Sequence, residues 1–346
     1  MTESSFGSKT LLTIGLSLLV VFTFLGNSSV LLVLLCRARR LLRKPLYVFI
    51  CNICLSDVFA TLFTMTFEVY EEITHEWWFG GEPSCKVVEY LEMTLFGVNI
   101  FTHLSIAIER FRNVVQPLKP PMKLKIAKIL VGVSWGVPSV LSLPYLYTLR
   151  LTETSEGKFI CTSVTMPLIW LDKLFLSVEL LVVFLIPLLG TAVLYTMVIR
   201  KLYKRKKQAD VVLPQATQTT MRAAAKYGSR VSIAVATVFV TCWIPFVVVY
   251  IARLFSSSDS VNRTSTLYVF ALYSSFVSEL LTPLLYCAFD RNIKPALRDT
   301  LRCRSRISVP SEESVSEVSA PRGGGTQVQR SEVASRVART SRIGMA

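Results

Sequence analysis

Ionisable and amide side chains recur along an otherwise apolar stretch, "VEYLEMTLFGVNIFTHLSIAIERF", residues 88–111. At about 100° per residue these groups share one stripe about 80° wide, whereas Glu109 points elsewhere. Polar groups within a membrane helix normally face other helices or a water-filled cavity. Glutamates at the start can bind a cation, and an arginine at the end can reach water or a partner carbonyl. The stripe contains Glu89, Glu92, Asn99, His103 and Arg110.

The elements that position this stripe are predicted to be membrane helices. The chain has 346 residues, of which 52% are hydrophobic and only 18% charged, with a mean hydropathy of +0.50; soluble domains carry about a quarter charged residues. The sequence contains seven long apolar runs, and each reaches the ~20 residues that a helix needs to span a bilayer. We therefore predict an all-α membrane protein, a seven-transmembrane helix bundle over residues 11–289. The seven runs are 11–36, 46–70, 86–109, 127–149, 173–199, 229–252 and 265–289.

Charge between the runs predicts the orientation. Basic segments follow the first, third, fifth and seventh runs, for example "RARRLLRK" and "RKLYKRKKQ", whereas "EEITHEWWFGGEPS" between the second and third has no Lys or Arg. Lys and Arg concentrate on the cytoplasmic side, so the short N-terminus, residues 1–10, is predicted outside. The net charge of +15 is then a topology signal rather than a sign of nucleic-acid binding. Residues 304–346 are predicted to form a disordered cytoplasmic tail.

Three features are predicted on the outer side. Only Cys85 and Cys161 lie outside, where oxidation occurs, which predicts a disulfide bond; the alternative is two unrelated free thiols. "LRLTETSEGKFICTSV" is predicted to form a β-hairpin ending at Cys161. Asn262-Arg263-Thr264 is an outer glycosylation sequon, whereas the Asn27 sequon lies within a helix and should be unmodified.

Motifs then occur in order along the runs. They are Gly26-Asn27, "LSD" with Asp57, Glu109-Arg110-Phe111, Trp135, Pro187 with Tyr195, "CWIP" with Pro245, "TPLLY" with Pro283 and Tyr286, and "FDRNIKPALRDTLRC". Together they resemble the motifs of the rhodopsin-like (class A) family of G-protein-coupled receptors. Phe111 and Thr282 replace the family's Tyr and Asn. The resemblance implies a plasma-membrane receptor with an extracellular N-terminus, a short amphipathic eighth helix over residues 290–303, and activation of heterotrimeric G proteins by a two-state helix rearrangement.

The resemblance also assigns an activation switch. Glu109 would hold Arg110 at rest, and Arg110 would contact the G protein, with Leu118, when the sixth helix swings out. The inner end of that helix, residues 221–231, offers no acid to restrain Arg110, which predicts a weak resting lock and basal signalling. The expected switch residues are Glu109, Arg110, Phe111, Tyr195, Pro245, Pro283 and Tyr286.

The family's sodium pocket has counterparts in the middle of the bundle. Glu279 adds a second carboxylate beside Asp57, and two nearby carboxylates seldom both ionise without a cation; either a cation binds or a proton replaces it. His103 is either a pH-sensitive switch or a hydrogen-bonded structural histidine. The expected ion site, with Na⁺ at Asp57, is Asp57, Asn99, Ser278, Glu279 and Thr282.

An acidic cup with aromatic walls, matching the family's ligand pocket, favours a cation. Alternatively, Glu89 and Glu92 merely pair with basic groups such as Arg253. The predicted hairpin resembles those that leave the cavity open in peptide receptors, and "LFLSVELLVVF" contains a single serine. Both features favour a cationic neuropeptide over a small biogenic amine. A constitutively active orphan receptor is the other alternative. The expected pocket is Glu68, Glu89, Glu92, Glu179, Trp243, Phe246, Tyr250, Leu272 and Phe276.

Other classes are disfavoured. An opsin needs a seventh-helix lysine for retinal, whereas residues 265–289 contain none and Phe276 takes the matching place; no organic cofactor is expected. A transporter would show paired repeats, and an enzyme a Cys/His or metal constellation.

Cys303 is a palmitoylation candidate that would contact membrane lipid. Tail serines could be phosphorylated by a receptor kinase for recognition by arrestin, the alternative being an ordinary solvated tail: Ser308, Ser311, Ser314, Ser316 and Ser319.

Overall fold

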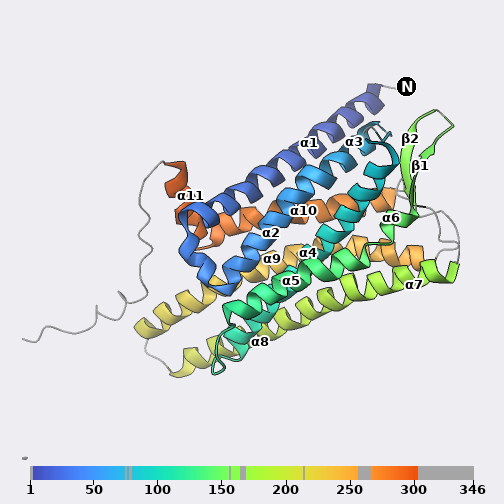
Figure 1. Cartoon of the computed structure of the whole chain (residues 1–346). Coiled ribbons are helices and arrows are strands. Elements are labelled where there is room, and N and C mark those ends of the chain that lie inside the picture. The colour runs from blue at the N-terminus through green and yellow to red at the C-terminus, as the bar shows by residue number, and fades with distance from the viewer. Residues whose placement is uncertain are drawn as a thin grey trace, which may run out of the picture. The chain divides into compact units, whose positions relative to one another are not determined.

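The computed structural model describes residues 3–74, 76–77, 80–155, 157–163, 169–212, 215–255 and 266–302. Within these residues, seven helical segments are long and apolar enough to cross a membrane (Figure 1). The prediction of seven spans is therefore confirmed. The spans are Thr13–Arg37, Pro45–Thr74, Gly81–Val115, Leu124–Thr148, Trp170–Lys204, Val231–Ala252 and Leu267–Phe289.

The second and fifth spans are each interrupted by one π-helical turn, the first ends in one, and the fourth contains two helices, α5 and α6. The α-helices are α1 Glu3–Leu32, α2 Pro45–Ala60, α3 Thr66–Thr74, α4 Gly81–Val115, α5 Leu124–Leu141, α6 Tyr145–Thr148, α7 Ile169–Glu179, α8 Ile186–Val212, α9 Gln215–Phe255, α10 Thr266–Phe289 and α11 Ile293–Leu301. The π turns are Val33–Arg37, Thr61–Met65 and Leu180–Leu185, a 3₁₀ turn spans Arg39–Arg43, and the strands are β1 Leu149–Glu153 and β2 Phe159–Ser163.

Helix α4 is the most enclosed span and carries the polar stripe. It packs against α2, α5 and α8, while α1 contacts α2 and α10, and α9 contacts α8 and α10. In α4, 78% of the most apolar window is buried, against 22% in the span that contains α5. A helix enclosed on nearly all sides can carry charged and amide groups without exposing them to lipid.

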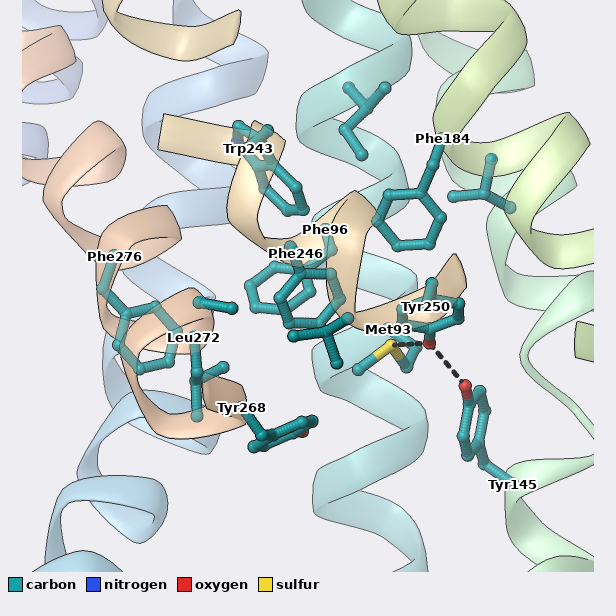
Figure 2. Close-up of a cluster of buried hydrophobic side chains, with 14 of the residues drawn as sticks. Met93, Phe96, Tyr145, Phe184, Trp243, Phe246, Tyr250, Tyr268, Leu272 and Phe276 are labelled. Atoms are coloured by element: carbon teal, nitrogen blue, oxygen red, sulfur yellow. Dashed lines mark hydrogen bonds between the residues drawn. The ribbon is translucent and has the colours of Figure 1, made fainter. Parts of the chain in front are cut away.

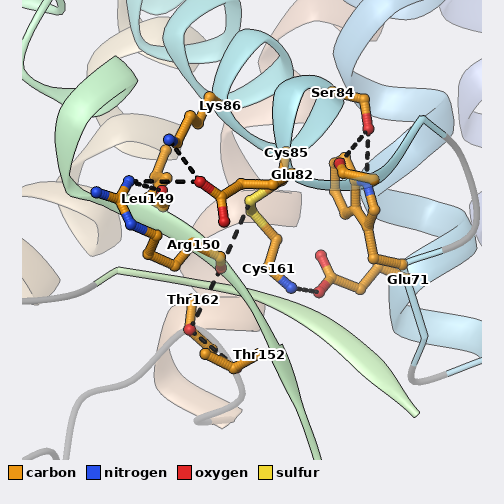
Figure 3. Close-up of a disulfide and its surroundings, with 12 residues drawn as sticks. Glu71, Glu82, Ser84, Cys85, Lys86, Leu149, Arg150, Thr152, Cys161 and Thr162 are labelled. Carbon is orange, nitrogen blue, oxygen red and sulfur yellow. Dashed lines mark hydrogen bonds and ion pairs between the residues drawn. A yellow bond between two sulfur atoms is a disulfide. The ribbon is translucent and has the colours of Figure 1, made fainter.

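A β-hairpin covers the outer end of α4 (Figure 3). Strands β1 and β2 pair antiparallel with Leu151 opposite Cys161, and Gly157 in the turn has a φ of 76°, which glycine adopts without strain. Cys161 forms a disulfide with Cys85 at the start of α4, with the two Cα atoms 5.6 Å apart. The backbone N–H of Cys161 also donates to Glu71 Oε1 at 3.3 Å. The predicted hairpin and disulfide are both confirmed.

The two π turns that interrupt spans were not predicted from sequence. One, Leu180–Leu185, lies just before Pro187, which lacks the N–H of a regular helical ladder. The other, Thr61–Met65, is stabilised by Thr66 Oγ1, which donates to the Thr61 carbonyl at 2.7 Å. An extra residue in a turn changes the direction of the side chains beyond it, and π turns are frequent at functional sites.

Helix α11 follows α10 after a short turn, within the range where a short amphipathic helix was expected. Asp290 Oδ1 accepts the backbone N–H groups of Asn292 at 2.8 Å and Ile293 at 2.9 Å, so this carboxylate satisfies donors at the helix start. Ile293 and Ala296 are buried, which anchors α11 on the end of the bundle. Cys303 lies outside the described residues.

Gly97 allows α4 and α5 to approach closely, and this yields a stability prediction. A Cβ at Gly97 would overlap Cβ and Cγ of Pro138 and would lie 3.3 Å from Val183 Cγ1. We expect Gly97→Ala to destabilise the protein by about 1–3 kcal/mol through overpacking, measured as a lower melting temperature after detergent solubilisation. A Cβ at Gly136 of α5 meets nothing within 4 Å, so Gly136→Ala is the matched control. Equal melting temperatures for the two variants would contradict the prediction.

Candidate functional site

The polar stripe of α4 faces the interior as predicted. Glu89, Glu92, Asn99 and His103 are all buried, and the side chain of Arg110 is 15% exposed at the inner end. Glu109 falls off the stripe on a helical wheel, yet it is also buried. Glu109 and Arg110 are neighbours in the sequence and point in different directions, yet both side chains are largely buried.

Three carboxylates meet at the outer end of the bundle, and we call Glu68, Glu89 and Glu92 the outer acidic cluster. Glu68 comes from α3, the other two from α4, and one oxygen from each lies within 4.8 Å of the others. Glu92 is completely buried, and neither of its carboxylate oxygens has a hydrogen-bond partner among the described residues. Among the described residues, the charged groups that act on Glu92 are Glu68, Glu279 and Glu71, all acidic.

Glu179 occupies a different environment from the outer acidic cluster. Tyr145 Oη donates to Glu179 Oε2 at 2.7 Å, Tyr250 Oη donates to the same oxygen at 3.3 Å, and the two hydroxyl groups are 2.7 Å apart. Tyr250 Oη also contacts Met93 Sδ at 3.2 Å (Figure 2). The sequence did not identify Tyr145, because this tyrosine follows Pro144 in the four-residue helix α6 and belongs to no motif.

The predicted aromatic walls meet one another in the bundle core (Figure 2). The ring of Phe96 lies 4.9 Å from Trp243 and 5.4 Å from Phe246, in edge-on geometry, and Phe184 lies 4.9 Å from Tyr250. At this depth the walls pack together, since all five predicted aromatic and aliphatic positions are buried. They are Trp243, Phe246, Tyr250, Leu272 and Phe276.

Phe96 and Phe184 complete this cluster and were missed by sequence reasoning. Phe96 lies on α4 between Glu92 and Asn99, and Phe184 lies in the π turn of the fifth span. Both are fully buried. An apolar residue in an apolar span carries no local signal of its contacts, so only the packing of the helices reveals these two residues.

The predicted ion site is assembled in the middle of the bundle. Asn99 Nδ2 donates to Asp57 Oδ1 at 2.8 Å, while Asp57 Oδ2 and both carboxylate oxygens of Glu279 have no hydrogen-bond partner among the described residues. Glu279 lies within electrostatic range of Asp57. Ser278 and Thr282 are buried nearby, with Thr282 Oγ1 donating to the Ser278 carbonyl at 2.8 Å. Buried, unpartnered carboxylate oxygens are the chemistry that a cation such as Na⁺ fits.

His103 contacts the sixth span. Its ring stacks on Phe239 of α9, with centroids 3.8 Å apart and planes 23° apart. The contact joins the middle of α4 to the helix that carries Trp243. Both proposed roles for His103 remain predictions.

The inner end of the stripe holds the predicted switch residues together. Arg110 Nε lies 3.4 Å from Glu109 Oε2, and Asn113 Nδ2 donates to Glu109 Oε1 at 2.6 Å. Tyr195 and Tyr286 are buried, and Arg110 lies within electrostatic range of both.

The remaining predicted positions lie elsewhere in the bundle, in the loop after α4, or outside the described residues. Phe111 is half-buried, Pro245 and Pro283 lie inside α9 and α10, and Leu118, between α4 and α5, is fully exposed. Asn262, the side chain of Arg253, Cys303 and the five tail serines lie outside the described residues.

Comparison with known proteins gives consistent matches over most of the chain. The family model described as "7 transmembrane receptor (rhodopsin family)" matches residues 26–286. The neuropeptide S receptor of Mus musculus is 25% identical, covering 84% of this chain and 79% of that protein. The gonadotropin-releasing hormone receptor of Octopus vulgaris is 25% identical, covering 78% and 68%. A histamine receptor of Homo sapiens is 24% identical, covering 88% and 84%.

Proposed function

Because the chain belongs to the rhodopsin family of seven-transmembrane receptors, we propose that it binds an extracellular cationic neuropeptide at the outer acidic cluster and activates heterotrimeric G proteins. The chain is a signalling receptor and not an enzyme. The observation that carries the ligand class is Glu92, which is completely buried and has two unpartnered oxygens. A buried carboxylate surrounded by other carboxylates is stabilised by a cation.

A peptide is favoured over a small amine by two observations. The pocket residues include a buried acid outside the outer acidic cluster, Glu179, which accepts hydrogen bonds from Tyr145 and Tyr250, so a ligand with more than one basic group would be recognised at two places. Two of the relatives described above are named for peptides. A small biogenic amine is the second candidate, favoured by the histamine receptor among the relatives.

Ligand entry would act on the packed aromatic cluster. Phe96 on α4 contacts Trp243 and Phe246 on α9 and, with centroids 6.1 Å apart, Phe276 on α10. A side chain inserted between these rings must separate α4 from α9 or α10. A closed cluster and a ligand-opened cluster are two discrete packings, and a ligand that binds only the second shifts the equilibrium towards it. Helix α9 continues to the end of the bundle where Tyr195 and Arg110 lie.

A sodium ion is part of the proposal. Asp57, Asn99, Ser278, Glu279 and Thr282 would hold it, and its charge would neutralise part of the carboxylate pair when bound. The protein's own groups orient the site, since Asn99 fixes one oxygen of Asp57 and Asn27 Nδ2 donates to the Glu279 carbonyl at 3.2 Å.

The inner partners are also proposals. Leu118 is a fully exposed leucine in the loop after α4, the position from which an apolar side chain can enter a groove of a G protein. A receptor kinase and arrestin would act on the tail serines, and a lipid chain on Cys303 would contact the membrane.

Replacement of Glu92 tests the ligand class. Cells that express the receptor with a promiscuous G-protein reporter would be screened with basic peptides and amines. We expect a cationic peptide agonist whose potency falls about 10–100-fold in Glu92→Gln, since a charge-assisted hydrogen bond contributes about 1.5–3 kcal/mol. The control is Glu82→Gln on the same helix, because Glu82 is exposed and pairs with Lys86 at 2.6 Å. An unchanged potency in Glu92→Gln would show that the pocket assignment is wrong.

A further inference from the structure

We propose that the outer acidic cluster, Glu68, Glu89 and Glu92, binds a divalent cation of the calcium class. The three side chains come from two different spans and converge on one point, with one oxygen of each within 4.8 Å of the other two. Glu68 and Glu89 are more than nine-tenths buried, and Glu92 is fully buried. The site is defined without reference to the organic ligand, so it goes beyond the proposed function.

Glu92 gives a second observation that points to a ligand. Its two oxygens have no hydrogen-bond partner among the described residues, although one of them is directed at Glu68 and Glu89. A fully buried carboxylate without a hydrogen bond is strongly destabilising unless a positive charge or a proton compensates it. The groups that act on it electrostatically are acidic, so the described surroundings supply no compensating charge.

The donor set and spacing select the type of cation. All three donors are carboxylate oxygens, which are typical of Ca²⁺, Mg²⁺ and Mn²⁺ rather than Zn²⁺, which favours nitrogen and sulfur. Calcium binds oxygen at 2.3–2.6 Å, so two ligands of one ion can lie up to about 4.6–5.2 Å apart. The three carboxylate oxygens, each within 4.8 Å of the other two, are therefore close enough to share one ion. Magnesium usually keeps several of its waters and is seldom bound by protein carboxylates alone, so calcium fits this donor set better.

Tyr273 extends the site from the seventh span. Its hydroxyl is buried without a hydrogen-bond partner among the described residues, and it lies within electrostatic range of Glu68 and Glu92. Calcium takes six to eight oxygen ligands, more than three carboxylates supply, so coordinated water must complete the shell. Tyr273 is placed to hydrogen-bond such a water and so to join α10 to the cation held by α3 and α4.

The charge balance leaves room for the proposed ligand. A divalent cation offsets two of the carboxylate charges of the outer acidic cluster, so a basic group of a peptide can still interact with this acidic region. The cation and the peptide therefore fill the same acidic region together. Because the cation would link α3 to α4, its binding should stabilise the receptor even without a peptide.

The test uses purified, ligand-free, full-length receptor in detergent after chelator treatment. Terbium(III), a luminescent calcium analogue excited through nearby tyrosine, would be titrated and then displaced by CaCl₂ or MgCl₂, with melting temperature as the second measurement. We expect terbium emission that Ca²⁺ displaces at a concentration at least about 10-fold below Mg²⁺, and a higher melting temperature in Ca²⁺. In Glu89→Gln and Glu68→Gln both effects should be lost or weakened at least about 10-fold. Glu82→Gln, an exposed acid on the same helix, should retain both.

The results separate the alternatives. Absence of displaceable emission in the wild type, or full retention in folded Glu89→Gln or Glu68→Gln, would overturn the proposal; a metal-free melting transition identifies which variants are folded. No peptide is present, so a failed agonist screen leaves this result intact. Conversely, loss of the calcium effect does not alter the agonist potency test with Glu92→Gln.

Discussion

The double replacement Cys85→Ser and Cys161→Ser is expected to cause the largest loss of stability among the substitutions considered. The disulfide closes a loop with a sequence separation of 76 residues, which corresponds to about 4–5 kcal/mol in the chain-entropy treatment. This figure is an upper bound here, since helices that remain inserted in the membrane already restrict the unfolded chain. We expect a clearly lower melting temperature and reduced binding at the outer acidic cluster.

The expected loss of binding has a structural cause. Without the disulfide, β2 is attached at this point by weaker contacts, such as the hydrogen bond from the Cys161 N–H to Glu71 and that from the Trp77 N–H to the Phe159 carbonyl at 2.6 Å. Glu71 accepts the hydrogen bond from β2 (Figure 3) and acts electrostatically on Glu92, so movement of the hairpin alters the outer acidic cluster.

The matched control for the disulfide is Cys36→Ser. Cys36 is a free, exposed cysteine, so its replacement removes a thiol without removing a crosslink. The melting temperature of each variant would be measured in the same detergent, with terbium titration as the binding measurement. Equal melting temperatures for the double variant and Cys36→Ser would contradict the prediction.

The spans and the inward stripe were predictable because both depend on local sequence pattern. Apolar length identifies a bilayer span, and the angle between positions on a regular helix places Glu89, Glu92 and Asn99 on one side. The disulfide followed from membrane sidedness alone, because only two cysteines were expected outside. None of these predictions needed knowledge of which helices are neighbours.

The remaining features depend on contacts between spans and could not be read from local pattern. The π turn at Thr61–Met65 changes the direction of the side chains that follow it in the second span, including Glu68, and no sequence motif marks it. Tyr145 reaches Glu179 only because α6 lies beside the fifth span. The stacking of Phe239 on His103 depends on the position of α9 against α4. The convergence of Glu68 with Glu89 and Glu92 was expected from the family's pocket, but its spacing required the structure.

Arg110 and Glu109 give the second large prediction, on signalling. Among the described residues, Glu109 is the acid that forms an ion pair with Arg110, and Asn113 fixes its other oxygen. The sequence of the inner part of α9 offers Arg222, Lys226 and Arg230 but no acid. The ion pair is long, at 3.4 Å, and neither Arg110 Nε nor Glu109 Oε2 has a hydrogen-bond partner among the described residues, so the pair should hold the resting state only weakly. The wild type is therefore expected to signal above untransfected cells.

Substitutions at this pair should move signalling in opposite directions. Glu109→Gln removes the ion pair and should raise basal second-messenger output about 2–5-fold, the change that ~0.5–1 kcal/mol produces in a two-state equilibrium. Arg110→Gln removes the cation that the active state presents to the G protein and should reduce output to background. Arg112→Gln is the matched control, because Arg112 instead donates to the Pro120 carbonyl at 3.2 Å. At matched surface expression, wild-type output equal to that of untransfected cells, or no rise in Glu109→Gln, would show that this pair does not restrain the receptor.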